Sequence, residues 1–367
     1  MRRLECLDGL RGLLAVYVLL GHMAPFAPLP GWIQSLVSHG GAAVDVFFVL
    51  SGLVIVQSLD TYHGTAVPFL IARVSRIFPA YLLVFTLAIA LQPLPCGFSA
   101  MPWIDADSPA RSICTSGWPT HWGLEILAHM TMTHGLIPVR MLPDVWVSFL
   151  GAAWSLSTEW QFYLLALASG SFRHTPAVLI VILFGLTAGG AFLAPTAFSR
   201  AFLPYHAHFF ALGVASAGVV AGTPGARLRY GLVLALTVAV CGLAGTPGKL
   251  LPPLIWTACL VMQMCPDILR FPGGRIARFL GRISYCLYLT NEPVQKVLAG
   301  LLGLIADGDP LLFTLLWAPA AIGLPVLVSV LLHHGLELPA QVRGRSVARS
   351  FITGSAKRSG QRRFPPL

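Results

Sequence analysis

The sequence predicts an all-α integral membrane protein, a bundle of about ten transmembrane helices. Hydrophobic residues make up 56% of its 367 residues, whereas charged residues make up only 10%. An average soluble domain has about 25% charged residues. In addition, apolar stretches long enough to cross a bilayer recur along the whole chain. These observations exclude a disordered chain and an ordinary soluble enzyme.

Ten apolar stretches form the predicted spans. Most of them approach the ~20 residues that a helix needs to cross ~30 Å of hydrocarbon. The stretches over 77–92 and 252–266 are the shortest. The predicted spans are 10–29, 41–59, 77–92, 147–169, 176–194, 202–222, 229–246, 252–266, 279–305 and 311–335.

The basic residues orient this bundle. The net charge is +10, and most of the 24 Lys and Arg residues lie in alternate loops and at the two ends of the chain. Because loops rich in Lys and Arg stay on the cytoplasmic side, both termini are predicted to be cytoplasmic. The basic excess is therefore an orientation signal, and the expected partner is the lipid bilayer, not a nucleic acid.

One membrane domain is expected over residues 1–340. Its longest loop, 93–146, lies outside and is rich in Pro and Trp, so we expect it to pack on the bundle. Cys96 and Cys114 share this loop and are expected to form a disulfide if that side is oxidising. The basic segment 341–367 has few large apolar residues and predicts a mobile cytoplasmic tail. No Cys/His spacing typical of a metal site occurs, so no metal is predicted.

Ionisable residues within the spans are candidates for function, because they are costly in lipid. Arg11 and His22 share one helical face, since eleven residues turn a helix about 20° past three full turns. Asp8 lies one turn before Arg11 and can pair with it. Arg11 either anchors the helix end at the interface or belongs to a site. His22 either makes a helix-packing hydrogen bond or handles protons.

Glu159 and Glu292 lie at about the same predicted depth as His22. A histidine and carboxylates at one depth suit proton transfer, because a carboxylate orients imidazole and raises its basicity. Glu292 is also one turn from Lys296, so an internal ion pair is an equally good interpretation. Asp45 lies near the outer end of the second span. Common depth does not establish contact, because the sequence does not say which helices are neighbours.

Arg73 and Arg76 lie on the cytoplasmic side, three residues apart and hence on one helical face. Together with Arg11, they suit a site for phosphate groups. The alternative is simple anchoring of the helix by positive charge on the inner side.

Five segments that contain these residues resemble the signatures of the membrane acyltransferase-3 family, in the family's order. That family includes O-antigen acetylases, nodulation-factor acetylases and macrolide acyltransferases. The resemblance runs from residue 4 to about 335. The segments are Asp8–Gly12 with His22, Val44–Gly52, Arg73–Tyr81, Trp154–Tyr163 and Leu280–Leu289.

The resemblance implies transfer of an acyl group, usually acetyl from acetyl-CoA, to a hydroxyl of a carbohydrate or related acceptor. It implies essential roles for Arg11 and His22, and a donor-side role for Arg73 and Arg76. Glu159 is expected to join Arg11 and His22 in catalysis because of its predicted depth. The resemblance also implies a bacterial inner-membrane protein that modifies cell-envelope polysaccharide, here without a fused hydrolase-like domain. A secondary metabolite and a lipid-linked sugar are the alternative acceptors. Supporting roles are expected for Asp8, Asp45, Ser155, Tyr163, Tyr288, Asn291 and Glu292.

One position departs from the family pattern. Many relatives carry His-x-Pro after the last signature, whereas this chain has Asn291-Glu292-Pro293. If that histidine contributes in relatives, Asn291 must act differently here.

His22 is predicted to act either as a general base or as a carrier of the acyl group, with Glu159 orienting it or stabilising its imidazolium form. A proton-coupled transporter or flippase that uses buried His22 and Glu159 is the alternative. The absence of inverted repeats and the cytoplasmic Arg-x-x-Arg sequence favour the enzyme. A structural scaffold is disfavoured by the buried charges.

Overall fold

The computed structural model describes residues 5–169, 176–243, 245, 247–265 and 274–358. Within these ranges the chain is helical, and its only β-type pairing is an isolated bridge between Pro138 and Phe198. The predicted all-α fold is therefore confirmed.

Each predicted span coincides with a helix of the described chain. Six segments are long and apolar enough to cross a membrane: Cys6–Phe26, Gly31–Thr61, Ala66–Leu91, Pro176–Leu193, Ala226–Leu243 and Pro310–Ile352. The helices are α1 (Glu5–Met23), α3 (Gly40–Thr61), α4 (Ala66–Leu91), α7 (Ala153–Ala168), α8 (Pro176–Leu193), α9 (Ala207–Val220), α10 (Ala226–Leu243), α11 (Leu251–Met264), α12 (Arg275–Ala306) and α13 (Pro310–Leu332).

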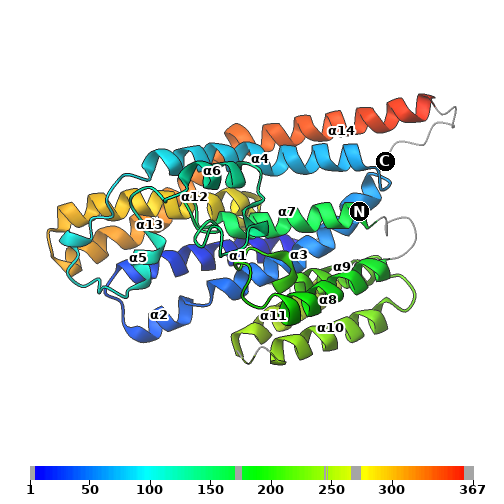
Figure 1. The fold of residues 1–367 in the computed structure, drawn as a ribbon, viewed down its shortest axis with the longest axis horizontal. Coiled ribbons are helices and arrows are strands. Elements are labelled where there is room, and N and C mark those ends of the chain that lie inside the picture. The colour runs from blue at the N-terminus through cyan, green and yellow to red at the C-terminus, as the bar shows by residue number, and fades with distance from the viewer. Residues whose placement is uncertain (1–4, 170–175, 244, 246, 266–273, 359–367) are drawn as a thin grey trace.

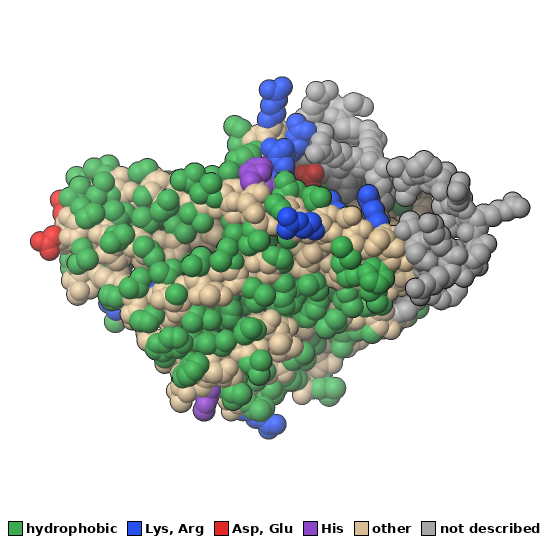
Figure 2. Space-filling model, turned by 90° about the horizontal axis from the view of Figure 1, so that it is seen from above, with side chains coloured by type: hydrophobic (Ala, Val, Ile, Leu, Met, Phe, Trp, Pro, Cys, Tyr) green, Lys and Arg blue, Asp and Glu red, His purple; other side chains and the backbone are tan. Residues whose placement is uncertain are grey.

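The long helices run side by side along the longest axis of the molecule (Figure 1). α1 begins and α14 (Leu338–Arg358) ends at the same end of the bundle, as the prediction of two termini on one side requires. Apolar side chains cover most of the face seen in Figure 2, whereas charged side chains are few and most of the visible Lys and Arg gather in one area. This surface suits contact with lipid.

Small residues bring two pairs of helices into close contact. A Cβ atom on Gly12 of α1 or on Gly281 of α12 would clash with the backbone of the opposite helix. Gly52 of α3 and Gly213 of α9 meet in the same way. Glycines at such positions let helix backbones approach closely in a membrane. The glycines of the first, second and last signature segments therefore fix which helices are neighbours.

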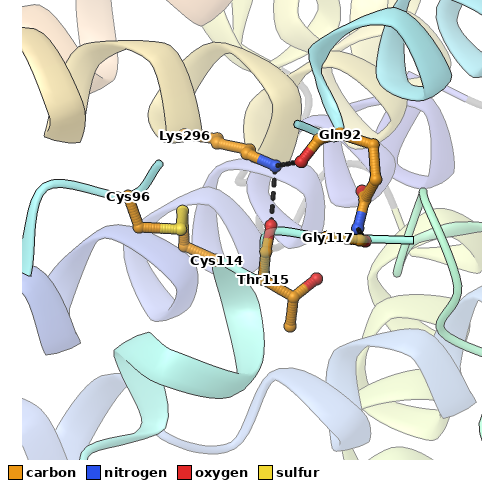
Figure 3. Close-up of a disulfide and its surroundings, with 6 residues drawn as sticks. All are labelled: Gln92, Cys96, Cys114, Thr115, Gly117 and Lys296. Atoms are coloured by element: carbon orange, nitrogen blue, oxygen red, sulfur yellow. Dashed lines mark hydrogen bonds between the residues drawn. A yellow bond between two sulfur atoms is a disulfide. The ribbon is translucent and has the colours of Figure 1, made fainter. Parts of the chain in front are cut away.

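The loop 93–146 packs on the bundle, as predicted, at the end opposite to the start of α1. We call this the outer end, after the orientation that the sequence predicts. The disulfide Cys96–Cys114 is present, with the two Cα atoms 6.0 Å apart, and lies beside Lys296 (Figure 3). Trp103 Nε1 donates a hydrogen bond to the carbonyl oxygen of Phe26 (3.0 Å). Short helices at this end include α2 (Gly31–Val37), α5 (Pro109–Ile113) and α6 (Trp122–Met130).

Two neutral histidines hold part of this loop. His129 of α6 stacks on His134 with ring centroids 4.1 Å apart, and its Nε2 bonds to the carbonyl oxygen of Val145 (2.7 Å). Burial lowers the pKa of His129 to about 4. Burial and the neighbouring His129 also lower the pKa of His134.

The predicted mobile tail differs from the structure over 341–358. The chain there continues α13 through a π-helical turn (His333–Glu337) into α14. α14 packs along α4, where Gly344 leaves room for Ser75 and Ala348 is fully buried. Small residues spaced one turn apart therefore make this contact, although the segment has few large apolar residues. Residues 359–367 lie outside the described residues.

Candidate active site

His22 faces a polar cavity beneath the outer loop. This cavity has a volume of about 410 Å³ and adjoins a second one of about 330 Å³. His22, Trp154, Arg200 and Glu292 line both of them. The two spaces form one outer cavity, which opens toward the side where the loop 93–146 lies.

The imidazole of His22 is held from one side. Its Nδ1 lies 2.6 Å from Oδ1 of Asn291 and 3.6 Å from Oε1 of Glu292. The amide nitrogen of Asn291 donates to the carbonyl oxygens of Leu287 (3.1 Å) and Tyr288 (2.7 Å), which leaves Oδ1 to accept. Nδ1 of His22 therefore carries the hydrogen, and Nε2 keeps its lone pair.

Glu292 is itself held by the two residues that precede α7. Its Oε2 accepts a hydrogen bond from the backbone N–H of Ala152 (3.0 Å), and the absence of a side chain at Gly151 makes room for the carboxylate. A carboxylate at this position stabilises a positive charge on His22.

A second, inner cavity lies toward the other end of α1. It has a volume of about 70 Å³ and is lined by Arg11, Arg76 and Glu159, among others. Oε1 of Glu159 accepts hydrogen bonds from Ser51 Oγ (2.5 Å) and from the hydroxyl of Tyr163. The structure thus brings together Arg11 of α1, Arg76 of α4, and Glu159 and Tyr163 of α7.

Arg73 lies next to this cavity but is buried in the interior of the bundle. It is 7% exposed, and its guanidinium carbon lies 5.7 Å from the ring centre of Phe69 and 5.6 Å from that of Tyr163. In the part of the chain that the structure describes, the buried Nε atoms of Arg11 and Arg73 have no hydrogen-bond partner. Asp8 acts electrostatically on Arg11 from one turn away.

Tyr288 separates the two cavities. It lines both of them, and its hydroxyl lies 2.8 Å from Oγ of Ser155. Arg11 and His22 share a helical face, but eleven residues of α1 place them about 16 Å apart along the axis. The predicted site therefore consists of two polar chambers joined at this hydrogen-bonded pair.

The structure corrects the pairing predicted for Glu159. Glu159 lies in the inner cavity with Arg11, and the carboxylate beside His22 is Glu292. The alternative ion pair between Glu292 and Lys296 is also absent, because Lys296 donates to the carbonyl oxygens of Gln92 and Thr115. Matching depth identified polar residues but not their helix neighbours.

Asp45 lies outside both cavities. It is 1% exposed, and its two carboxylate oxygens lie 2.8 Å from His206 Nδ1 and 2.8 Å from Lys249 Nζ. The other ring nitrogen of His206 bonds to the carbonyl oxygen of Arg200 (3.0 Å). Asp45 thus supports the backbone that carries Arg200.

Arg200 and Ser51 were not predicted. Arg200 enters the outer cavity with its guanidinium carbon 4.6 Å from the ring centre of Trp154. It stands alone in a short loop, and nothing in the sequence distinguishes it from an ordinary loop arginine. Ser51 lies inside the second signature segment, Val44–Gly52, and its place there could have identified it as a candidate site residue.

Another buried polar group lies at the π-helical turn. His333 Nδ1 and the thiol of Cys286 bond to Oε2 of Glu337 (2.7 and 3.1 Å), and Gln341 donates to its Oε1 (2.7 Å). These hydrogen bonds give both carboxylate oxygens of Glu337 a partner and join α12 to the π-helical turn that follows α13.

The model of the acyltransferase-3 family, described as an acyltransferase domain, matches residues 4–334. The chain belongs to the acyltransferase-3 family. No curated protein and no solved structure matches it. The acyltransferase-3 match spans both cavities and ends before α14. The chain is therefore a membrane acyltransferase, and this favours the enzyme over the transporter.

Proposed function

We propose that this acyltransferase moves an acetyl group from acetyl-CoA to a hydroxyl of a carbohydrate acceptor in the bacterial inner membrane, with ten crossings and both termini in the cytoplasm. The observation that carries the proposal is the position of His22. Its Nδ1 is held by Asn291, and it faces the outer cavity, while Arg11 and Arg76 line the inner cavity.

The inner cavity suits the phosphates of coenzyme A. Arg11 and Arg76 line this cavity beside Glu159, and Arg73 adds positive charge from behind it, so positive charge is in excess there. The buried Nε of Arg11 also lacks an acceptor among the described residues. Phosphate oxygens accept hydrogen bonds from guanidinium groups in a paired geometry. A phosphate at this position would satisfy both the charge and the unused donor.

The thioester must pass Tyr288 to reach His22. The inner cavity, at about 70 Å³, has room for about two waters at ~30 Å³ each. The donor arm therefore enters by widening this space and parting the Ser155–Tyr288 hydrogen bond. This supports a closed resting state that opens when the donor binds.

In the proposed reaction, Nε2 of His22 takes the proton of the acceptor hydroxyl as its oxygen attacks the thioester carbonyl. The carbon–sulfur bond then breaks, the ester forms, and the imidazolium returns the proton to the coenzyme A thiolate. Glu292 stabilises the imidazolium between these steps. A positioned general base contributes roughly 10²–10⁴-fold to the rate.

The same geometry supports a second route, in which Nε2 of His22 itself accepts the acetyl group and then passes it to the hydroxyl. A single-turnover reaction with acetyl-CoA and no acceptor separates the routes. An acetylated His22 peptide is expected only for the carrier route.

The test compares His22→Ala with His39→Ala. His39 is an exposed histidine at the start of α3, on the same side of the bundle. Cells that make each variant are assayed for O-acetyl groups on envelope glycans, and purified protein is assayed for thiol release from acetyl-CoA. We expect His22→Ala to abolish both while it still binds acetyl-CoA. His39→Ala should match the unmodified protein.

Full O-acetylation by a folded His22→Ala variant would refute the proposal. So would glycan O-acetylation that proceeds without release of thiol from acetyl-CoA.

A further inference from the structure

An apolar groove opens on the side of the bundle between α4, α12 and α13. Its volume is about 610 Å³ and its lining is almost wholly apolar, including Leu83, Leu87, Val328 and Leu331. Leu87 and Leu331 are exposed, so the groove faces the surrounding bilayer. We call this space the lipid-side groove.

The lipid-side groove lies next to the outer cavity. Leu91 at the end of α4 and Pro293 in α12 line both spaces. The outer cavity is polar and holds His22, whereas the groove is apolar. The two spaces therefore suit a membrane molecule whose hydrocarbon part lies in the groove and whose polar part lies in the outer cavity.

Lys296 lines the outer cavity, one turn along α12 from Pro293, which lines both spaces. Its Nζ donates to the carbonyl oxygens of Gln92 (3.1 Å) and Thr115 (2.6 Å), as Figure 3 shows. Both acceptors are neutral, and among the described residues no carboxylate lies within 4 Å of Nζ. An ammonium group has three donors, so one N–H remains for a ligand.

Arg200 adds a second cation to the outer cavity. Its guanidinium stacks on Trp154 and, in the described chain, is without a carboxylate partner. The cavity also contains Asp144 and Glu292, but Glu292 is taken up by His22 and Ala152. Two such cations suit a phosphate group.

We propose that the acceptor is a lipid-linked glycan, joined to its hydrocarbon chain through a phosphate. The chain lies in the lipid-side groove, the phosphate lies at Lys296, and a sugar hydroxyl faces Nε2 of His22. This inference rests on the proposed function, because His22 defines where the hydroxyl must lie. The apolar chain contributes binding energy that does not depend on the sugar.

The test uses a photoactivatable long-chain isoprenoid phosphate and the matching neutral alcohol as probes. The protein is placed in phosphatidylcholine nanodiscs, and labelled peptides are identified by mass spectrometry. We expect the phosphate probe to label α4, α12 and α13 at least about tenfold more than the alcohol, as a charged hydrogen bond predicts. Leu87→Trp should reduce labelling by both probes, whereas Leu315→Trp, on an exposed part of α13 outside the groove, should not.

Lys296→Met should remove the advantage of the phosphate probe, and Lys296→Arg should keep most of it. Lys296→Arg keeps a positive charge at this position, so its labelling shows whether an effect of Lys296→Met comes from the lost charge or from a folding defect. Equal labelling by the two probes would overturn the proposal. Displacement of the probe by excess phosphatidylglycerol, or labelling spread evenly over α8 and α10, would also overturn it, since the groove would then bind ordinary lipid.

This readout involves no acyl transfer. If the labelling pattern holds while His22→Ala keeps its activity, the proposed reaction fails and the lipid site stands. If thiol release depends on His22 but the labelling pattern is absent, the reaction stands and the lipid-linked acceptor fails.

Discussion

Oδ1 of Asn291 lies 2.6 Å from Nδ1 of His22. This contact gives Asn291 a defined role as the hydrogen-bond acceptor for His22. An asparagine whose amide donors are taken by Leu287 and Tyr288 can only accept at Oδ1. Asn291 therefore fixes the tautomer of His22 with the hydrogen on Nδ1.

Asn291→Leu is expected to lower kcat for acetyl transfer by roughly 10²-fold or more, with a much smaller change in KM. The leucine fills similar space but cannot accept from Nδ1, so His22 is free to adopt the tautomer that lacks a base at Nε2. The measurement is steady-state thiol release, with thermal unfolding as a check on the fold.

Asn291→Asp serves as the control, because it keeps an acceptor oxygen toward His22. It should retain more activity than Asn291→Leu. A leucine variant with unchanged kcat would show that the tautomer of His22 does not limit the reaction.

Most of the polar residues of the site could be predicted from the sequence, but the carboxylate predicted to lie beside His22 was the wrong one. Arg11, His22, Arg76 and Glu292 all line the two cavities, because ionisable residues within apolar spans are few. The sequence placed Glu159 beside His22, since depth is readable from distance along a span and helix neighbours are not.

The neighbours are decided by packing that leaves little trace in a single sequence. α12 lies against α1 because Gly12 and Gly281 meet there, and this contact brings Asn291 and Glu292 to His22. Glycines are frequent in this chain, so no one pair stands out before the fold is known. The helix over 341–358 was missed for the same reason, because its contact depends on Gly344 and Ala348.

Arg73 and Arg76 are expected to differ when replaced, although both belong to one Arg-x-x-Arg sequence. Arg76→Ala should weaken acetyl-CoA binding roughly tenfold, because Arg76 lines the inner cavity and one guanidinium–phosphate contact is lost. Its melting temperature should change little. Arg73→Ala should mainly lower the melting temperature, because Arg73 is buried against Phe69 and Tyr163.

Equilibrium binding of acetyl-CoA and thermal unfolding of both variants in detergent provide the measurements. The distinction fails if Arg73→Ala is as stable as the unmodified protein and binds the donor more weakly than Arg76→Ala does.

Ser155→Ala is expected to increase hydrolysis of acetyl-CoA in the absence of an acceptor. The substitution removes the hydrogen bond to Tyr288 that separates the inner and outer cavities, so water from the outer cavity gains access to the thioester. We expect a rise of several-fold, as the loss of one hydrogen bond of about 1 kcal/mol predicts.

Ser157→Ala on the same helix is the matched control. Ser157 bonds to the carbonyl oxygen of Met132 and lines neither cavity. Equal hydrolysis by the two variants would mean that the Ser155–Tyr288 pair does not separate the cavities.

Mild acid is expected to loosen the outer loop around His129. Burial lowers the pKa of His129 to about 4, whereas an unfolded chain has a histidine pKa of about 6.5. The folded loop thus holds fewer protons, so its stability is full above pH 6.5 and falls as the pH drops from 6.5 toward 4. At ~1.4 kcal/mol per pH unit, the loss from His129 reaches about 3 kcal/mol at pH 4.

Hydrogen exchange of the α6 amides between pH 7 and pH 5, corrected for the intrinsic rate, measures this loss. His129→Gln keeps a donor for the carbonyl oxygen of Val145 but does not titrate, so it should flatten the dependence. The variant should not abolish the pH dependence, because the buried His134 remains and its pKa is also lowered. An identical pH dependence in both proteins would show that protonation of His129 is not what opens the loop. Since this loop roofs the cavity of His22, its loosening should also lower acetyl transfer at pH 5 more in the unmodified protein than in His129→Gln.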